Sequence, residues 1–362
     1  MEMSNIHRFP YEWRLSDGYP AKSIENHQST VFGTFICGGG STMGYKLAGY
    51  HHLGGVEIDP KVADVYKRNH SPEYMYVEDV RHFLNREDLP DELYRLDLFD
   101  TSPPCTSFSI AGVREKAWGK KKHFKEGQQL QMLDDLVFVA CDVIRKLHPK
   151  TFLLENVSGL IKGNAKSYAK RILDRLMKYG YAVQVFCLNA ASMGVPQTRE
   201  RVFFIGHKKE YHLPKLVLDF HEPPILFGDI IENGMTDCNV SDKVKELWGK
   251  RIKTDFNLAD ILQRTENRCS RFNERIIHSD RVAPTFTSQM CNHGILYDYP
   301  RKLNIGEQKK ICTFPLDYKV GDREFGFFGG MSVPPVMTAQ ISYEIWKQWI
   351  KPIKENYINK QR

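Results

Sequence analysis

Residues 30–60 read TVFGTFICGGGSTMGYKLAGYHHLGGVEIDP, and the order of their apolar, glycine and acidic segments indicates the fold class. The apolar run 31–36 has the composition of a buried strand, which the glycines at 38–40 end. A helical pattern follows, and a second short strand with Val56 and Ile58 ends at Asp59-Pro60, where another helix is expected to begin. A strand, glycine turn, helix and acid-tipped strand in this order are typical of a doubly wound sheet that holds a nucleotide-type cofactor.

The same alternation of strands and helices continues to residue 206. We expect helices at 130–147 and 168–177, and strands at 96–100, 151–154, 182–188 and 201–205. Strands that alternate with helices favour an α/β fold with a mostly parallel sheet and helices on both faces.

Three segments are expected along the chain. Residues 1–206 form a catalytic and cofactor-binding domain, with a lead-in at 1–29 to which the sequence assigns no role. Residues 207–300 are charged, loop-rich and short of helical periodicity, which indicates a separate, smaller domain. Residues 301–362 return to helical patterns, at 303–312 and 336–349, and complete the catalytic domain.

Composition favours a polyanionic partner and argues against a metal site. The formal charge of the 362 residues is +7. The eight cysteines include no C-x-x-C pair, and Cys291 with His293 is too small a set for zinc, so we expect no metal. No apolar stretch is long enough to cross a bilayer, and the first residues do not resemble a secretory signal. We therefore expect a cytoplasmic protein without a membrane partner.

Glu57 is the first candidate site residue. At the tip of the second strand, its carboxylate can accept hydrogen bonds from both hydroxyls of a ribose. The glycines at 38–40 allow the backbone to approach the ligand closely. A purely structural turn is the alternative, and nicotinamide-dependent enzymes share the pattern.

The second candidate is Cys105, in the sequence Ser102-Pro103-Pro104-Cys105. The prolines stiffen a turn at the carboxyl end of a strand, where open α/β sheets place their ligands. A thiol held there is favoured as a nucleophile over a buried, inert cysteine.

Two further motifs follow at strand ends. Glu155 in Glu155-Asn156-Val157 can give a proton to a pyrimidine ring nitrogen, and capping a helix is its structural alternative. Arg199 and Arg201, in Gln197-Thr198-Arg199-Glu200-Arg201, are expected to share a face and to grip a base carbonyl and a phosphate. A solvated salt-bridge cluster with Glu200 is the alternative there.

In this order the motifs resemble the cytosine-5 DNA methyltransferases, of the prokaryotic or phage modification type, along nearly the whole chain from Val31. The set also includes Glu78-Asp79-Val80, then residues 301–303 through Phe314-Pro315, and Gly330-Met331-Ser332-Val333-Pro334. The resemblance implies a Rossmann-like class I methyltransferase domain, and it implies that residues 207–300 are the target-recognition domain.

The resemblance also implies a role for each matched residue. Cys105 is the nucleophile that adds to C6 of cytosine, Glu155 binds N3, and Arg201 holds the base with support from Arg199. The residues implied in binding S-adenosylmethionine are Phe35, Gly38, Gly39, Gly40, Glu57, Ile58, Asp79, Val80, Pro104, Leu136, Ser332 and Val333. Those implied in binding the substrate are Ser102, Pro103, Asn156, Val157 and Gln197.

Three positions depart from the family pattern. Cys37 replaces the first glycine of the cofactor loop, Thr106 replaces the glutamine after the nucleophile, and Met331 replaces an asparagine. None of these changes removes a bond-making group, so we expect activity with an altered cofactor affinity.

The implied partner is double-stranded DNA, from which the target cytosine must be rotated out. The lysine-rich segment 114–125 is expected to close over DNA, although a solvated loop is the usual reading of such a charge run. S-adenosyl-L-homocysteine is the implied product. We expect a monomer that modifies DNA in a bacterial or phage-infected cell, paired in function with a cognate restriction endonuclease.

Three other functions fit parts of the sequence. A transfer-RNA cytosine-5 methyltransferase would share the nucleophile and the acid, but the length of the candidate recognition region favours DNA. A catalytically silent DNA-binding relative would usually lack one of the two groups that this chain keeps. A nicotinamide-linked dehydrogenase explains only the glycine turn.

Overall fold

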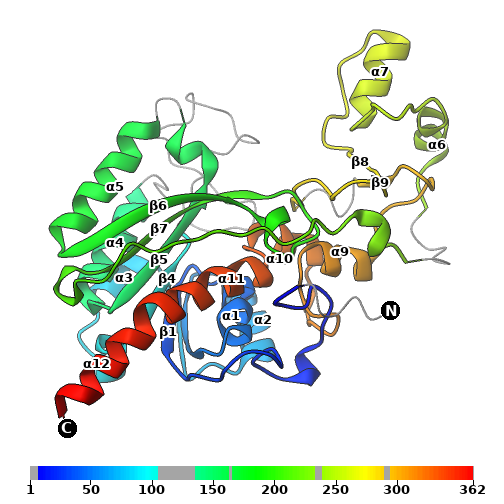
Figure 1. The fold of residues 1–362 in the computed structure, drawn as a ribbon. Coiled ribbons are helices and arrows are strands. Elements are labelled where there is room, and N and C mark those ends of the chain that lie inside the picture. The colour runs from blue at the N-terminus through cyan, green and yellow to red at the C-terminus, as the bar shows by residue number, and fades with distance from the viewer. Residues whose placement is uncertain (1–6, 105–134, 163–164, 233–238, 289–293, 362) are drawn as a thin grey trace. The chain divides into compact units, whose positions relative to one another are not determined.

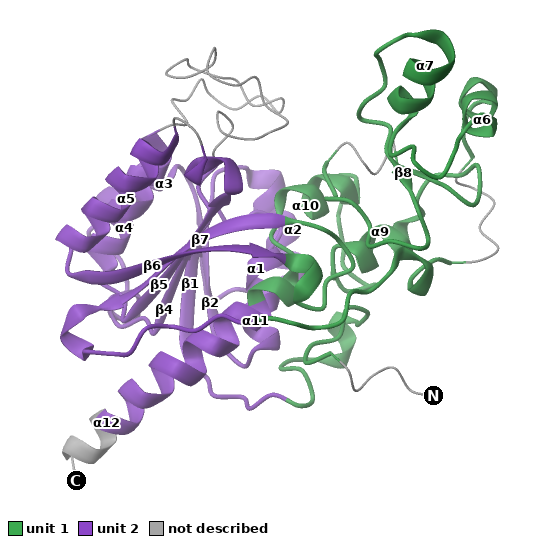
Figure 2. Ribbon diagram, turned by 45° about the horizontal axis from the view of Figure 1, so that its top comes forward, with its two compact units in different colours: residues 1–23, 190–199, 220–338 green, residues 24–189, 200–219, 339–362 purple. Residues whose placement is uncertain are grey.

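The computed structural model describes residues 7–104, 135–162, 165–232, 239–288 and 294–361. The chain folds into two compact units (Figure 2). Unit 1 contains Met1–Ser23, Ala190–Arg199 and Phe220–Thr338, and unit 2 contains Ile24–Asn189, Glu200–Asp219 and Ala339–Arg362. In the described residues, no helix is both long and apolar enough to cross a membrane.

Unit 2 is built on a seven-stranded sheet with the order β3-β2-β1-β4-β5-β7-β6. The strands are β1 (Thr30–Thr34), β2 (His51–Glu57), β3 (Tyr74–Val77), β4 (Leu98–Thr101), β5 (Thr151–Val157), β6 (Tyr181–Asn189) and β7 (Glu200–Lys208). The first five strands in chain order pair in parallel, and β7 runs antiparallel to both β5 and β6. The predicted mostly parallel, doubly wound sheet is confirmed.

Helices cover both faces of this sheet, as predicted (Figures 1 and 2). One face carries α3, α4 and α5, and the other carries α1 and α2. The helices of unit 2 are α1 (Gly40–Leu47), α2 (Pro60–His70), α3 (Val80–Asn85), α4 (Leu136–Leu147) and α5 (Lys166–Lys178). Near the C-terminus, α11 (Pro335–Ile345) continues through a π-helical turn (Trp346–Ile350) into α12 (Lys351–Gln361).

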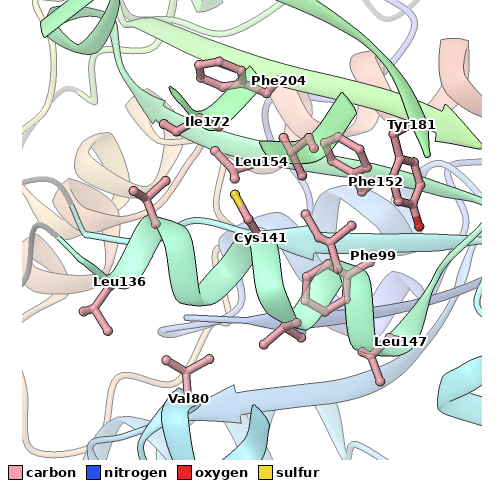
Figure 3. Packing of buried hydrophobic residues seen from close by; sticks show 14 of the residues in the cluster. Val80, Phe99, Leu136, Cys141, Leu147, Phe152, Leu154, Ile172, Tyr181 and Phe204 are labelled. Atoms are coloured by element: carbon pink, nitrogen blue, oxygen red, sulfur yellow. The ribbon is translucent and has the colours of Figure 1, made fainter. Parts of the chain in front are cut away.

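The main core lies between the sheet and α3, α4 and α5 (Figure 3). Phe99, Phe152 and Phe204 project from three strands toward Cys141 of α4 and Ile172 of α5. Each large apolar side chain buried in this way contributes about 1.5–3 kcal/mol. This packing holds β4 and β5 rigidly, and these are the strands that carry most of the candidate site.

Unit 1 contains more helix than the sequence patterns indicated. Its elements are α6 (Asp242–Gly249), α7 (Leu258–Glu266), β8 (Ile276–Ile277), β9 (Ile295–Leu296), α9 (Ile305–Ile311) and α10 (Phe325–Met331). Residues 207–300, which the sequence indicated as loop-rich and short of helical periodicity, contain the helices α6 and α7. Asn257 and Asp260 cap α7 reciprocally, and its apolar face packs in a second small core with Val240 and Ile276. Short 3₁₀ turns occur in both units, at Leu15–Asp17, Asp91–Tyr94, Ser158–Ile161, Ala190–Ser192, Lys209–Tyr211 and Phe227–Asp229.

The lead-in, which the sequence left without a role, has a structural one within unit 1. The Trp13 indole donates to the Thr313 carbonyl at 2.9 Å, and the Leu15 amide donates to the Asp317 carboxylate at 2.7 Å. Phe9 is fully buried. These contacts attach the lead-in to the segment that follows α9.

Candidate active site

The loop after β1 turns through several left-handed residues. Phe35, Cys37 and Gly39 have φ angles of 59°, 46° and 85°. A Cβ atom on Gly39 would lie 2.2 Å from Nε2 of His70, so only glycine fits there. Cys37 occupies a conformation that costs an L residue about 1 kcal/mol or more, so the glycine that the resemblance implies at this position would be less strained.

Glu57 connects this loop to the start of α2. One carboxylate oxygen accepts the Cys37 amide at 3.0 Å and the other accepts the Asp59 amide at 2.9 Å. Burial raises the pKa of Glu57 to about 7. Each oxygen has a second lone pair, so the carboxylate can accept two further hydrogen bonds, such as those from a ribose.

Asp79 lies at the carboxyl end of the neighbouring strand β3. The Glu78 amide donates to the Glu57 carbonyl at 3.1 Å, which continues the pairing of β2 with β3 as far as this point. The Asp79 carboxylate caps α3 through the Arg81 amide at 2.8 Å. Of the other residues implied in cofactor binding, Phe35 packs against the main core, and Val80 and Leu136 are buried within it (Figure 3).

The turn that leads to Cys105 is held from β5. Ser102, Pro103 and Pro104 follow the end of β4, and the Asn156 side chain donates to the Pro103 carbonyl at 3.3 Å. Asn156 is itself buried, and its side-chain oxygen accepts the Val157 amide at 2.9 Å. Cys105, Thr106 and the basic segment 114–125 lie outside the described residues.

Glu155 and Arg201 form an ion pair, with 3.0 Å between Oε1 and Nε. Arg201 lies opposite Val157 in the β5–β7 ladder, so alternate residues place both side chains on the same face. Their side chains are only 12% and 16% exposed, respectively. Glu155 is the fifth residue of β5, inside the strand and not beyond it as predicted.

Arg199 has different partners from Arg201. Its side chain is 2% exposed, and its two terminal nitrogens donate to the carbonyls of Phe286 at 2.9 Å and Gly330 at 3.0 Å. Gln197 is also buried, and it bonds to the Ile311 carbonyl and the Phe286 amide. The grip on a base and a phosphate stays a prediction. The Arg199 contact with Gly330 instead holds the segment Gly330-Met331-Ser332-Val333-Pro334, here called the terminal motif, within unit 1.

The terminal motif contains a buried hydroxyl that can receive a ligand. Ser332 and Val333 are both buried within unit 1. The Ser332 Oγ has no hydrogen-bond partner among the described residues. Because buried polar groups are nearly always paired, this hydroxyl is suited to a polar ligand group such as the amino-acid end of the cofactor.

The structure adds two residues that the sequence analysis overlooked. Asp100 of β4 is 3% exposed, and its carboxylate accepts the Tyr45 hydroxyl of α1 at 3.0 Å. Burial raises the pKa of Asp100 to about 7. The sequence shows Asp100 as the second of two acids in the predicted strand 96–100, where it is interpreted only as the end of that strand.

The described residues contain no cluster of three or more metal-ligating side chains. In unit 2 the candidate polar groups are Glu57 at the carboxyl end of β2, the Asp100–Tyr45 pair at β4 and the Glu155–Arg201 pair at β5. Open α/β sheets bind their ligands at these ends.

Residues 31–347 match the family of C-5 cytosine-specific DNA methylases. The chain belongs to this family. It is 34% identical to the type II methyltransferase M1.HphI of Haemophilus parahaemolyticus over 348 residues, which cover 88% of this chain and 87% of that one. The chain is thus a DNA cytosine-5 methyltransferase of the prokaryotic modification type.

Solved structures agree with the fold. A prophage-encoded Escherichia coli protein, assigned as a DNA modification methyltransferase, superposes with a TM-score of 0.65 at 18% identity, covering 88% of this chain and 99% of that one. A DNMT2 of Spodoptera frugiperda superposes with a TM-score of 0.60 at 14% identity, covering 88% of this chain and 99% of that one. At these identities the likeness concerns the class I methyltransferase fold alone.

Proposed function

We propose that the enzyme transfers the methyl group of S-adenosylmethionine to C5 of a cytosine flipped out of a specific duplex sequence, through a covalent bond to Cys105. The Glu155–Arg201 pair is the observation that carries the proposal. It brings an acid of β5 and a cation of β7 together on one face of the sheet, and β5 is also the strand whose Asn156 holds the turn before Cys105.

Several residues fit the cofactor. Glu57 would accept the ribose hydroxyls beside the loop that contains Gly38, Gly39 and Gly40. The Ser332 hydroxyl would accept a hydrogen bond from, or donate one to, the amino-acid end of S-adenosylmethionine. When bound, S-adenosylmethionine supplies a sulfonium methyl group and leaves as S-adenosyl-L-homocysteine.

The protein residues would act on the base in two stages. The Cys105 thiolate forms a bond to C6 while Glu155 gives its proton to N3, which leaves the electron pair on C5 for the incoming methyl group. Loss of the C5 proton to a base then expels the thiolate, and N3 returns its proton to Glu155. Arg201 fixes the Glu155 carboxyl throughout, because its guanidinium forms a charge-assisted hydrogen bond with one oxygen.

The proposal includes the setting in which the enzyme works. The net charge of +7 supports a polyanionic substrate. We infer a monomer that acts in the cytoplasm of a bacterial or phage-infected cell and protects one DNA sequence from a cognate restriction endonuclease. Residues 207–300 are proposed as the target-recognition domain, between 1–206 and the return segment 301–362.

A transfer assay with labelled S-adenosylmethionine tests the substrate class. We expect methyl transfer to duplex DNA and none to a matched amount of transfer RNA. Bisulfite sequencing of DNA from expressing cells then identifies the methylated sequence. Transfer to RNA in preference to DNA would overturn the proposed substrate, and label on adenine would overturn the proposed chemistry.

Cofactor binding is expected to depend on pH through Glu57. Because burial raises the pKa of its carboxyl to about 7, the group becomes neutral as pH falls through 7 and loses charge-assisted bonds to the ribose. The Kd for S-adenosylhomocysteine should therefore be lowest above pH 8 and rise by up to about tenfold per pH unit below 7. Calorimetric titration from pH 8.5 to 5.5 measures this effect.

Glu57→Gln is the matched control for that titration. It keeps the side-chain shape but has no titrating carboxyl, so its Kd should be weaker and nearly constant over the same range. A wild-type Kd that does not change with pH would exclude Glu57 as the group that binds the ribose.

A further inference from the structure

We propose that Asp100, with Tyr45 as its hydrogen-bond partner, is a positioning residue that keeps a proton on Glu155 for transfer to the target base. This inference rests on the proposed function and assigns a part in it to two residues outside the family motifs. It is carried by the arrangement of three charged groups on one face of the unit 2 sheet.

The register of the strands places these groups together. Asp100 lies opposite Leu153 in the parallel β4–β5 pair, two residues before Glu155. Because side chains alternate along a strand, Asp100, Leu153 and Glu155 point to the same face. Arg201, opposite Val157, points to that face as well. Tyr45 of α1 covers this face and donates to Asp100 at 3.0 Å.

The two carboxyls differ in their partners among the described residues. Arg201 forms an ion pair with Glu155, and no described lysine or arginine forms one with Asp100. Described groups near Asp100 are the phenols of Tyr45 and Tyr66, the Thr101 backbone, the carboxyl of Glu155 and, on β1, Gly33. One guanidinium compensates one carboxylate, so a second buried negative charge is strongly disfavoured.

The charge of Asp100 is therefore expected to change near neutral pH, beside Glu155. Burial raises the pKa of Asp100 to about 7; the Tyr45 hydrogen bond opposes this rise and the charge of Glu155 adds to it. The repulsion is mutual, so an ionised Asp100 favours the protonated form of Glu155. In the reaction, that proton moves from Glu155 to N3 as the bond from Cys105 to C6 forms, and it returns when the thiolate leaves.

Asp100→Asn tests this inference through the pH dependence of single-turnover methyl transfer. Activity is expected to fall at high pH, where Glu155 has no proton to give. Removing the charge of Asp100 should move this fall to lower pH by about one unit. The rate should then be near wild type at pH 6 and about tenfold lower at pH 8.5. Tyr45→Phe should move the profile in the same direction by less, because it removes a bond that favours ionised Asp100.

Thr101→Val is the matched control. Thr101 is the next residue of β4 and faces the opposite side of the sheet, where its buried hydroxyl bonds to Thr34 at 2.7 Å. Its replacement removes a buried polar contact from the same strand, so it should cost stability without moving the pH profile. If Asp100→Asn does not fold, Tyr45→Phe against this control carries the test.

A second measurement separates this inference from the proposed function. The carboxyl carbon of Glu155 can be titrated by NMR in ¹³C-glutamate-labelled enzyme without DNA, with Glu155→Gln providing the assignment. A lower midpoint of the Glu155 titration in Asp100→Asn supports the inference. It would do so even if the wild type transferred no methyl group to DNA, because that failure would overturn only the proposed function. Identical titrations and identical pH profiles in an active enzyme would overturn the role of Asp100.

Discussion

Cys105→Ala should abolish methyl transfer, by about 10⁴-fold or more, because no other group in the proposed mechanism can form the bond to C6. An ordinary thiol has a pKa near 8.5, so even the wild type reacts through a minor thiolate population that alanine removes altogether. Single-turnover transfer to duplex DNA measures the loss. Binding of the same DNA, followed by gel shift, should change by no more than about twofold, since the phosphate contacts supply most of the affinity.

Cys187→Ala is the control for this substitution. Cys187 is an exposed cysteine on β6 with no part in the proposed mechanism, so its loss tests whether removing any exposed thiol affects the reaction. DNA with 5-fluorocytosine at the target should form a denaturation-resistant adduct with wild type and Cys187→Ala, because fluorine cannot leave as a proton does. Retained turnover in Cys105→Ala, or an adduct formed by it, would remove Cys105 from the nucleophile role.

The catalytic unit was largely predictable because its signals are local. The glycine turn, the acid at the tip of β2 and the two prolines before Cys105 each lie within a few residues of a strand end. Alternating apolar strands and helices then fix which strand ends meet at one edge of a parallel sheet. β3 was overlooked because it is only four residues long, although Tyr74, Tyr76 and Val77 are of types that favour strands.

The contacts that escaped prediction join segments distant in the chain. Arg199 bonds to carbonyls at Phe286 and Gly330, and Trp13 bonds to the carbonyl of Thr313. A backbone carbonyl carries no sequence signature, so no motif could identify these partners. Asp100 is visible in the sequence as an acid of the predicted strand 96–100, but only the fold shows that the Tyr45 hydroxyl of α1 donates to it.

Glu155→Gln should lower the rate of methyl transfer by about 10²–10⁴-fold, the range typical of losing a general acid. The amide keeps the shape of the side chain, and its oxygen can still accept from Arg201 in place of the carboxylate oxygen 3.0 Å away. Folding should therefore be preserved, with a midpoint of urea unfolding near that of the wild type. The amide cannot release a proton to N3, so the defect should lie in the chemical step and not in DNA binding.

Comparison with Arg201→Ala separates proton transfer from positioning. That substitution leaves a largely buried carboxylate without its ion-pair partner, so it should destabilise the fold by up to about 3–5 kcal/mol as well as slow the reaction. Glu210→Gln, which removes a mostly exposed carboxylate 3.7 Å from Lys208, should change neither property. If Glu155→Gln kept wild-type rates while Arg201→Ala lost activity, the pair would act by holding the base alone, and the proton for N3 would have to come from another group.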